Sequence, residues 1–583
     1  MTPSAPWIAQ YGNVPATLEY PPLTMYRMVL RMCQAHPELP AYEFMGRKTT
    51  YRQFAQRLDR TARALYAMGV RKGTRVTICM PNMPQAVDTF YALNKLGAIA
   101  NMVHPLSAPS EIAFYLRDAQ SAIILTLDQF AEKVVTAAGQ VKEQVTILVA
   151  QPADELKFVM KIGYKLTQKP KGIPALPEQA KDRIILWRDM MKAADSVKED
   201  VEDHELKDTD AGAILYSGGT TGTTKGILLS SRNFNALGLQ TEAASGYESV
   251  VGYKMLSVMP IFHGFGLGVC IHTALITGME CILVPKFNVD TYTDLLKKKK
   301  PNFIAGVPTL YEALLRNKNL EGVDLSYLRG VFSGGDSLSI ELKKKVDTFL
   351  KAHNAPVQIR EGYGTTECVT ASCLTPKDTY REGSIGVPFP DTFYRITKVG
   401  EDTELPYGEE GEICISGPSV MIGYNNNPAE TAATLHTDED GRVWLHTGDL
   451  GMMDADGFVY FRQRIKRMII TSGYNVYPAQ LENIIDAHES VHMSCVIGVP
   501  DPYKMQRVKA FVMLKPGVPA TEETREDILA YCRKRIAKYA MPKEIEFRDE
   551  LPKTLVGKVA YRVLEEEEEA KRKAEEAKNA QKS

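Results

Sequence analysis

A short stretch dense in glycine and hydroxyl side chains is the strongest candidate for chemistry in this sequence. Residues Tyr216 to Gly226 read YSGGTTGTTKG and follow the apolar run AGAIL, which begins at Ala211. Glycines let backbone N–H groups approach an anion closely, and Ser and Thr add hydroxyl donors, so such a loop can hold a polyphosphate. No Gly-Lys-Ser/Thr closes a four-residue gap after a glycine, as it does in P-loop enzymes. We therefore predict a phosphate-binding loop of another class.

Charged side chains recur beside short glycine-containing turns further along the chain. Glu367 ends EGYGTTE, where a carboxylate suits a hard cation with oxygen ligands. Asp449 ends WLHTGD, after an apolar-aromatic run. Lys558 lies in TLVGKVAY, in a loop that contains a glycine, and a lysine is a compact point charge. Taken alone, each of these residues is more often structural than functional.

The motifs and their order resemble the adenylate-forming superfamily, which includes acyl-CoA synthetases, adenylation domains of peptide synthetases, and luciferases. The glycine-rich loop is followed, in family order, by MPIFHGFG, FSGGDSLS, EGYGTTE, GEICISGPSVMIGY, WLHTGD, FRQRIKRMIITSGYNVYPAQLE and LPKTLVGKVAY. The resemblance covers nearly the whole chain. The loop variant YSGGTTG and the run from Trp7 to Pro22 look most like long-chain fatty acid–CoA ligases.

The resemblance implies a role for each matched residue. It implies catalytic roles for Lys558, Glu367, Thr366 and His263, with Glu367 as the Mg²⁺ ligand. A satisfied core histidine is the second interpretation of His263. Nucleotide or CoA contacts are implied for Ser217, Gly218, Gly219, Thr220, Thr221, Gly222, Thr223, Thr224, Lys225, Gly335, Asp336, Gly362, Tyr363, Gly364, Thr365, Asp449, Arg464, Lys466, Ser472, Gly473 and Tyr474.

Within this set, some roles are more specific. Tyr363 would stack on adenine, and Asp449 with Arg464 would bind the ribose. Lys466 matches the family's hinge, about which the small domain swings between two poses. In one pose Lys558 enters the site for adenylation, and in the other the face carrying Ser472-Gly473-Tyr474 closes it for thioester formation.

Composition narrows the class of protein. The chain has 583 residues, 44% of them apolar and 24% charged, and a net charge of −1, so it is an ordinary globular protein with no global attraction to nucleic acid. Nine cysteines without a CxxC pair indicate reduced thiols, and the first residues lack a secretion signal. We expect a cytoplasmic protein, and the sequence leaves its oligomeric state open, a dimer included.

Alternating patterns predict the elements that position these motifs. Strands at 75–80, 98–103 and 122–127 alternate with helices at 85–96 and 111–119. The same alternation of strand and helix returns at 279–307. This predicts a doubly wound α/β body over residues 1–465. A small α+β domain follows over 466–564, with strands at 468–471 and 508–514 and helices at 478–487 and 524–538, the latter opened by Thr524. Residues 565–583 are predicted to be a frayed or disordered charged tail.

These expectations combine into one function with named alternatives. We expect an AMP-forming ligase that uses ATP, Mg²⁺ and CoA on a medium-to-long-chain fatty acid. Small residues between Gly264 and Gly278 could leave an apolar channel, and no tryptophan lies beside EGYGTTE to close it. An aryl- or bile-acid CoA ligase, and a stand-alone adenylation enzyme that loads a carrier protein, remain alternatives. A binding or regulatory protein that keeps the fold without activity is a third interpretation, which the presence of Glu367, Asp449, Arg464 and Lys558 disfavours.

One segment suggests a peripheral contact with the inner face of a membrane. Residues 156–172 carry Lys157, Lys161, Lys165 and Lys169 at four-residue spacing, which places them roughly on one helical face, and no acidic residue interrupts the run. Such a segment can lie on an anionic lipid surface. The other interpretation is an ordinary solvated face of a surface helix, since the segment is short and Gly163 weakens a helix.

Overall fold

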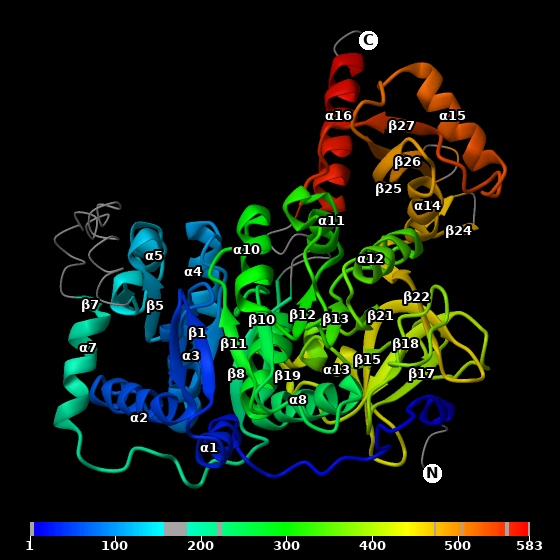
Figure 1. Cartoon of the computed structure of the whole chain (residues 1–583). Helices are drawn as coiled ribbons and strands as arrows, with labels where there is room; N and C mark the ends of the chain where they lie inside the picture. Colours follow the sequence, from blue (N-terminus) through cyan, green and yellow to red (C-terminus); the bar gives the residue numbers. More distant parts are fainter. Residues whose placement is uncertain are drawn as a thin grey trace.

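The computed structural model describes residues 5–156, 183–217, 224–471, 474–501, 503, 505–553 and 559–580, with backbone alone at 289–291, 474–475 and 575–580. The described strands form four sheets. Two large sheets lie side by side, a smaller sheet follows them, and the last sheet belongs to a unit that sits above the body (Figure 1). The mixed α/β class predicted from the sequence is confirmed.

The first large sheet has the order β19-β9-β8-β4-β3-β5-β6-β7. From β8 to β7 in this order, neighbouring strands pair in parallel. Strand β9 pairs in antiparallel fashion with both β8 and β19. The strands are β3 (Arg75–Cys79), β4 (Ile99–Met102), β5 (Ile123–Leu127), β6 (Thr146–Ala150), β7 (Ile184–Leu186), β8 (Ala211–Tyr216), β9 (Gly226–Ser230) and β19 (Gly423–Tyr424). The associated helices are α2 (Tyr51–Ala67), α3 (Pro84–Lys95), α4 (Pro109–Ala119), α5 (Ala131–Ala138) and α7 (Trp187–Ala193).

The second large sheet has the order β16-β15-β14-β13-β12-β10-β11-β1-β2, with a parallel centre and antiparallel pairs at both ends. Its strands are β1 (Pro40–Phe44), β2 (Arg47–Thr50), β10 (Lys254–Ser257), β11 (Glu280–Leu283), β12 (Phe303–Gly306), β13 (Gly330–Ser333), β14 (Ile359–Tyr363), β15 (Cys373–Leu374) and β16 (Val387–Pro388). The helices are α1 (Met25–Ala35), α8 (Ser231–Ser245), α9 (Thr273–Ile276), α10 (Val289–Lys299), α11 (Pro308–Arg316) and α12 (Ile340–Ala352).

Two smaller sheets complete the chain. The third comprises β17 (Phe393–Thr397), β18 (Gly411–Ser416), β20 (Leu435–Thr437), β21 (Val443–Met453) and β22 (Val459–Arg464), accompanied by α13 (Pro428–Thr434). The fourth comprises β23 (Ile469–Thr471), β24 (Tyr474–Val476), β25 (Val491–Asp501), β26 (Met505–Leu514) and β27 (Glu544–Phe547), with helices α14 (Pro478–Asp486), α15 (Glu522–Arg533) and α16 (Tyr561–Ala580). The change of sheet falls between β22 and β23, which suits a boundary at 465/466; the three-part division of the chain stays a prediction.

Several predicted elements agree with the structure to within one or two residues, and two differ. The strands and helices expected between 75 and 127 all form. The helix expected at 524–538 instead spans Glu522–Arg533. It begins earlier because Thr521 is the N-cap residue: the Thr521 side chain accepts a hydrogen bond from the backbone N–H of Thr524. The charged run from residue 565 continues a helix that begins at Tyr561.

A buried lysine explains why the charged C-terminal helix is ordered against the sheet. Lys509 on β26 is 3% exposed and pairs with Glu544, Glu546 and Glu568 at 2.7, 2.8 and 2.9 Å. Glu568 is on α16, whose Leu564 is fully buried. A buried charge is costly unless it is paired, so three carboxylates around one ammonium tie α16 to β26 and β27. The sequence pattern of α16 alone could not show this.

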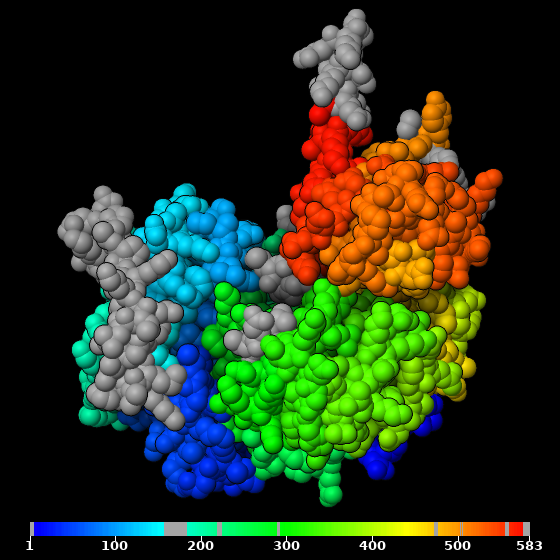
Figure 2. Space-filling model, turned by 45° about the horizontal axis from the view of Figure 1, so that its top comes forward, coloured from blue at the N-terminus to red at the C-terminus, as the bar shows by residue number. Residues whose placement is uncertain are grey.

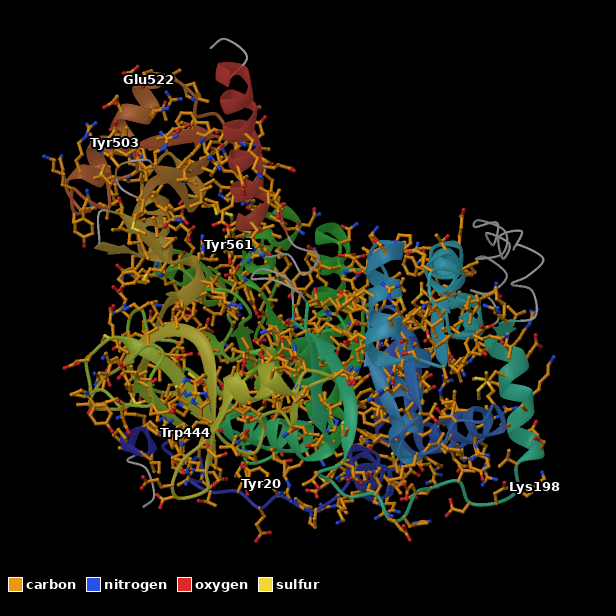
Figure 3. The ribbon with its side chains drawn as sticks, turned by 180° about the vertical axis from the view of Figure 1, so that it is seen from behind. Tyr20, Lys198, Trp444, Tyr503, Glu522 and Tyr561 are labelled. Carbon is orange, nitrogen blue, oxygen red and sulfur yellow. The ribbon has the colours of Figure 1, made fainter. Side chains whose placement is uncertain are left out.

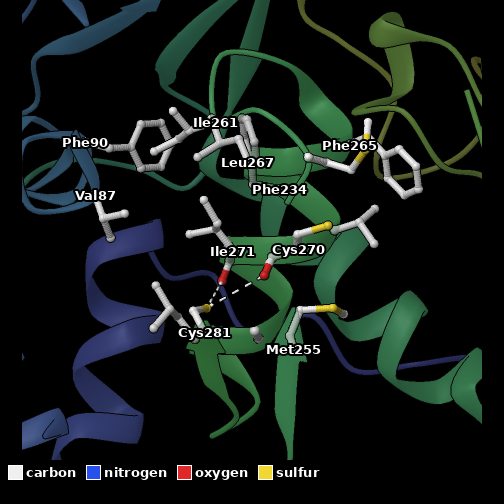
Figure 4. Close-up of a cluster of buried hydrophobic side chains, with 14 of the residues drawn as sticks. Val87, Phe90, Phe234, Met255, Ile261, Phe265, Leu267, Cys270, Ile271 and Cys281 are labelled. Atoms are coloured by element: carbon white, nitrogen blue, oxygen red, sulfur yellow. Dashed lines mark hydrogen bonds between the residues drawn. The ribbon is translucent and has the colours of Figure 1, made fainter. Parts of the chain in front are cut away.

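The apolar segment 260–279 is mostly buried and is not an ordinary α-helix. Phe265–His272 adopts a π-helix that continues into α9. Its side chains pack with those of α3, α8 and β11 in one cluster, in which the Cys281 thiol donates to the carbonyls of Cys270 and Ile271 (Figure 4). Among the described residues, no helix is both long and apolar enough to cross a bilayer.

Candidate active site

A strained turn at the end of β14 forms the centre of the site. The motif EGYGTTE runs from β14 into a short 3-10 helix, Thr366–Cys368. The next two residues, Val369 and Thr370, have φ of 54° and 83°, which β-branched residues rarely adopt. Gly364 is required here, because a Cβ at this position would lie 2.5 Å from the carbonyl oxygen of Thr370. Such strain persists where surrounding contacts enforce it, and it is typical of functional sites.

Antiparallel pairing of β21 and β22 brings the two predicted ribose-binding residues together. Asp449 lies directly opposite Arg464 in the register, and Arg464 Nε is 3.3 Å from Asp449 Oδ1. The other carboxylate oxygen accepts from the Tyr363 hydroxyl at 2.7 Å. The Asp449 side chain is nearly buried, at 2% exposed, and the Arg464 side chain is 42% exposed. A fixed, buried carboxylate therefore faces a more accessible guanidinium.

Glu367, the predicted Mg²⁺ ligand, lies close to this pair. Its Oε1 accepts from the Tyr424 hydroxyl at 2.9 Å, which orients the carboxylate. The negative charge of Asp449, with a smaller contribution from Glu367, raises the pKa of Arg464 above its usual value. Tyr424 holds one oxygen of the Glu367 carboxylate. This arrangement suits a hard cation, which binds a carboxylate through one or both of its oxygens. Asp449, Arg464, Tyr363 and Glu367 thus form one site.

The glycine-rich loop connects two antiparallel strands at the edge of this site. β8 leads into Ser217, and Lys225 precedes β9, with Ser217 N donating to the Lys225 carbonyl at 3.2 Å. Lys225 Nζ pairs with Glu430 and lies 4.9 Å from the ring centroid of Tyr424. Tyr424 therefore links the loop's lysine to Glu367. Residues 218–223 lie outside the described residues, so the predicted contacts of Gly218, Gly219, Thr220, Thr221, Gly222 and Thr223 stay predictions, as does that of the described Thr224.

The loop after β13 packs against the end of β14. Gly335 has φ of 79°, and Asp336 is exposed, with its carboxylate accepting from the Ser337 N–H at 3.0 Å. Glu361 joins this loop to β14, because its Oε1 accepts from the Leu338 N–H at 3.0 Å. Burial raises the pKa of Glu361 to about 8, so this carboxyl is protonated over much of the neutral range.

His263 lies just before the π-helix, on an element separate from the ribose-binding pair. The ring Nδ1 of His263 accepts from the Phe265 backbone N–H at 3.2 Å, and the backbone N–H of His263 donates to the Pro260 carbonyl at 3.0 Å. The segment does touch the strained turn, because a Cβ on Gly264 would lie 2.0 Å from Thr370 Oγ1. This position suits a residue that shapes a pocket beside the turn. Both interpretations of His263, as a pocket residue and as a core histidine, stay predictions.

The glycines of this segment serve close packing and do not themselves open the expected apolar channel. A Cβ on Gly266 would lie 2.1 Å from the Pro260 carbonyl oxygen. A Cβ on Gly268 would lie 2.7 Å from Leu237 Cδ2. Real Cβ atoms do not approach so closely, so neighbouring atoms already fill the space that the missing side chains leave. An acyl channel must be bounded by other residues.

The C-terminal unit contacts the body beside the site. Lys466 is exposed within the 3-10 helix Ile465–Arg467, between the third and fourth sheets, as a hinge requires. Tyr561, at the foot of α16, lies 4.8 Å below the Arg467 guanidinium and is labelled where the unit meets the body in Figure 3. The unit rests on the α11 and α12 part of the body (Figure 2), where His492 contacts Arg316 and lies 3.9 Å from Glu312.

Several predicted residues lie outside the part of the chain that the structure describes. Lys558, Ser472 and Gly473 lie outside the described residues, and of Tyr474 only the backbone in β24 is described. Segment 157–172 lies outside them as well, so its membrane contact stays a prediction. Val559 pairs with Lys553 in an isolated bridge, and Tyr561 lies near Arg467 and Arg464.

Sequence reasoning missed several residues that build the site. Tyr424 ends a recognised motif but had no role assigned, although its hydroxyl orients Glu367. Phe461, whose ring centroid is 5.8 Å from that of Tyr363, and Glu361 were likewise without roles. Each lies within or next to a quoted motif, so motif membership was the available signal. Glu430, the partner of Lys225, lies outside the motifs and carried no such signal.

Comparisons with known proteins agree with this geometry. The family model described as AMP-binding enzyme matches residues 30–425, and that described as AMP-binding enzyme C-terminal domain matches 480–558. A Bacillus subtilis long-chain-fatty-acid–CoA ligase is 37% identical, covering 97% of this chain and 99% of that protein. An Escherichia coli protein of the same name is 32% identical, covering 92% and 93%.

A solved structure places the fold in the same group. The ATP-bound MatB protein of Rhodopseudomonas palustris superposes with a TM-score of 0.78 at 26% identity, covering 93% of this chain and 99% of that one. The predicted resemblance to the adenylate-forming superfamily is thereby confirmed. The structure brings buried Asp449 opposite Arg464 and close to Glu367. The two family models match the chain on both sides of the Asp449–Arg464 pair. The chain belongs to the family of AMP-binding enzymes.

Proposed function

We propose that this chain is an AMP-forming acyl-CoA ligase that activates a medium-to-long-chain fatty acid. In the first half-reaction, a carboxylate oxygen attacks the α-phosphorus of ATP and pyrophosphate leaves. In the second, the sulfur of CoA attacks the acyl carbonyl carbon and AMP leaves. The grouping of Asp449, Arg464 and Tyr363 beside Glu367 carries the proposal, because it offers a ribose-binding carboxylate and a cation-binding carboxylate in one site.

Each described residue has a physical task in this scheme. Asp449 would accept hydrogen bonds from ribose hydroxyls, and Tyr363 keeps that carboxylate in place. Arg464 would add positive charge next to the nucleotide. Glu367 would hold Mg²⁺, which when bound neutralises charge that develops on the phosphates. Because these groups are fixed before the nucleotide binds, little reorganisation opposes the reaction.

The names of the most similar relatives support a fatty acid as the acyl substrate. Both curated relatives reported above are named long-chain-fatty-acid–CoA ligases, and each matches nearly the whole chain. The chain has tryptophan at positions 7, 187 and 444. Trp444 is buried on β21, where its indole N–H donates to Asp438 at 2.8 Å, and so it does not line the turn at Glu367. Trp7 and Trp187 also lie outside the segment that carries this turn.

A substrate screen tests the proposal. Purified protein with ATP, Mg²⁺ and CoA should release pyrophosphate and AMP with fatty acids of about eight to sixteen carbons, a length that a buried apolar pocket can hold. Acetate should give much lower kcat/KM, because each buried methylene contributes roughly 0.8 kcal/mol. Release of ADP and phosphate, or turnover of benzoates without any fatty acid, would contradict the assignment.

We also propose that residues 156–172 make a peripheral contact with an anionic lipid surface. Each of the four lysines would contribute about 1 kcal/mol near such a surface. In co-sedimentation with anionic vesicles, the protein should pellet at low salt and less so at high salt. Changing Lys157, Lys161, Lys165 and Lys169 to Gln should abolish pelleting.

The matched control changes the same number of charges elsewhere. Four exposed lysines serve for this: Lys297 and Lys298 on α10, Lys300 directly after it, and Lys318 beyond the end of α11. Their replacement by Gln should leave vesicle binding unchanged. Equal loss of pelleting in the two quadruple variants would show that only net charge matters. Equal recovery of parent and first variant in the supernatant would leave segment 156–172 as an ordinary surface.

A further inference from the structure

A cluster of histidine and carboxylate side chains lies on the third sheet, apart from the residues assigned to ATP. His436 is on β20, His446 is on β21, and Asp402 is in the turn that joins β17 to β18. His436 lies opposite Trp444, which Figure 3 labels, and His446 lies opposite Cys414. Antiparallel register therefore places both imidazoles next to each other, with ring centroids 4.1 Å apart.

The spacing of the polar atoms suits a metal ion. His446 Nε2 is 3.0 Å from Asp402 Oδ1, and His436 Nδ1 is 3.1 Å from both Asp402 oxygens. One ligand atom from each residue lies within 4.8 Å of the other two. Ligand atoms about 2 Å from a tetrahedral zinc ion lie roughly 3.3 Å from one another. The three side chains can therefore reach one ion with small adjustments.

An outer partner for the buried histidine is already in place. His446 Nδ1 is 3.1 Å from Glu412 Oε2, and the other oxygen of Glu412 accepts from the Gly448 N–H at 2.9 Å. A histidine that binds metal through one nitrogen commonly donates the other N–H to a carboxylate, which fixes the ring. Cys414 Sγ, at 3.5 Å from the same Nδ1, adds a second contact on this inner side.

Exposure differs between the two sides of the cluster. The side chains of His446 and Glu412 are each 8% exposed, whereas His436 is 36% and Asp402 57% exposed. The inner side is therefore fixed by packing, while the outer side is open to solvent. An ion could enter from solvent and keep a water molecule as its fourth ligand, which is the usual form of a three-ligand zinc site.

We propose that Asp402, His436 and His446 bind one divalent transition-metal ion of the zinc class. Two imidazole nitrogens favour zinc, copper or nickel over Mg²⁺ and Ca²⁺, which prefer oxygen ligands. The site is thus chemically distinct from the one proposed at Glu367. Arg395 also donates to Asp402 Oδ1, at 3.1 Å; it orients the carboxylate, and its charge reduces the affinity for a cation.

Zinc titration of the chelator-treated full-length protein tests the proposal. Calorimetry should detect one Zn²⁺ ion whose affinity falls at least about ten-fold in His436→Ala and in Asp402→Asn, because each removes one of three ligands. Glu412→Gln should weaken binding roughly ten-fold, the usual size of an outer-partner effect, while its amide oxygen can still accept from Gly448. Cobalt added in place of zinc should give visible absorption bands typical of a four-coordinate site with nitrogen ligands.

A histidine in a similar electrostatic setting provides the control. His204 Nε2 is 2.9 Å from Asp200, but these two do not join a third ligand at metal-binding distances among the described residues. His204→Ala should therefore leave zinc affinity unchanged, and unfolding temperatures of all variants without metal report whether they are folded. Absence of zinc binding to the parent protein, or equal zinc affinity in the parent and the folded Asp402→Asn/His436→Ala double variant, would overturn the proposal.

Discussion

Lys558→Ala should lower the rate of carboxylate-dependent exchange of pyrophosphate into ATP by roughly 10²–10³-fold, or about 3–4 kcal/mol of transition-state stabilisation. The reason is the loss of a positive charge that would bridge the attacking carboxylate and the α-phosphate. Thioester formation from supplied acyl-adenylate should remain close to that of the parent. That separation is expected because the second half-reaction uses the other pose of the small domain, from which Lys558 is withdrawn.

Controls for this prediction come from the same part of the chain. Lys553 is exposed five residues earlier, and its backbone pairs with Val559, so Lys553→Ala tests the loss of a nearby charge without the proposed role. Replacing Gly473 with a bulky residue, or Lys466 with Pro, should impair the CoA step more than adenylation. Equal loss of both half-reactions in Lys558→Ala would argue against two poses.

Asp449→Asn should raise the KM for ATP by roughly 10–100-fold, because hydrogen bonds that involve a charged group contribute about 1.5–3 kcal/mol. Asparagine keeps the shape of the buried side chain, and its amide oxygen can still accept from the Tyr363 hydroxyl. It removes the negative charge opposite Arg464 and replaces one acceptor with a donor. Pyrophosphate exchange measured at varied ATP concentration would show the change, and thermal unfolding would report the fold.

A neighbouring aspartate on the same pair of strands provides a matched control. Asp454 follows β21 and accepts from Arg381 and from the Tyr460 hydroxyl, each at 3.1 Å, so its polar environment resembles that of Asp449. Asp454→Asn should leave the KM for ATP within about two-fold of the parent, since no contact with nucleotide is assigned to it. If both variants shift the KM equally, the effect reflects the strand pair and not a ribose contact.

Much of the body could be predicted because its signals are local. The strand–helix alternation from Arg75 to Leu127 repeats over short distances, and the observed elements agree closely with it. The order of the motifs predicted the family, which the comparisons confirm. The start of α15 was predicted wrongly because Thr521 and Thr524 can both cap a helix. In the structure the backbone N–H of Thr524 donates to the Thr521 side chain, so Thr521 is the cap.

By itself, the sequence determined the class of fold, the membership of the family and the identities of most candidate residues, because residue types, spacing and order carry that information directly. Tertiary structure alone decided which side chains meet. Asp449 faces Arg464 through the register of β21 and β22, Tyr424 reaches Glu367 from another sheet, and His436 meets His446 across β20 and β21. Register depends on packing of whole faces between distant segments, and so it cannot be derived from local patterns.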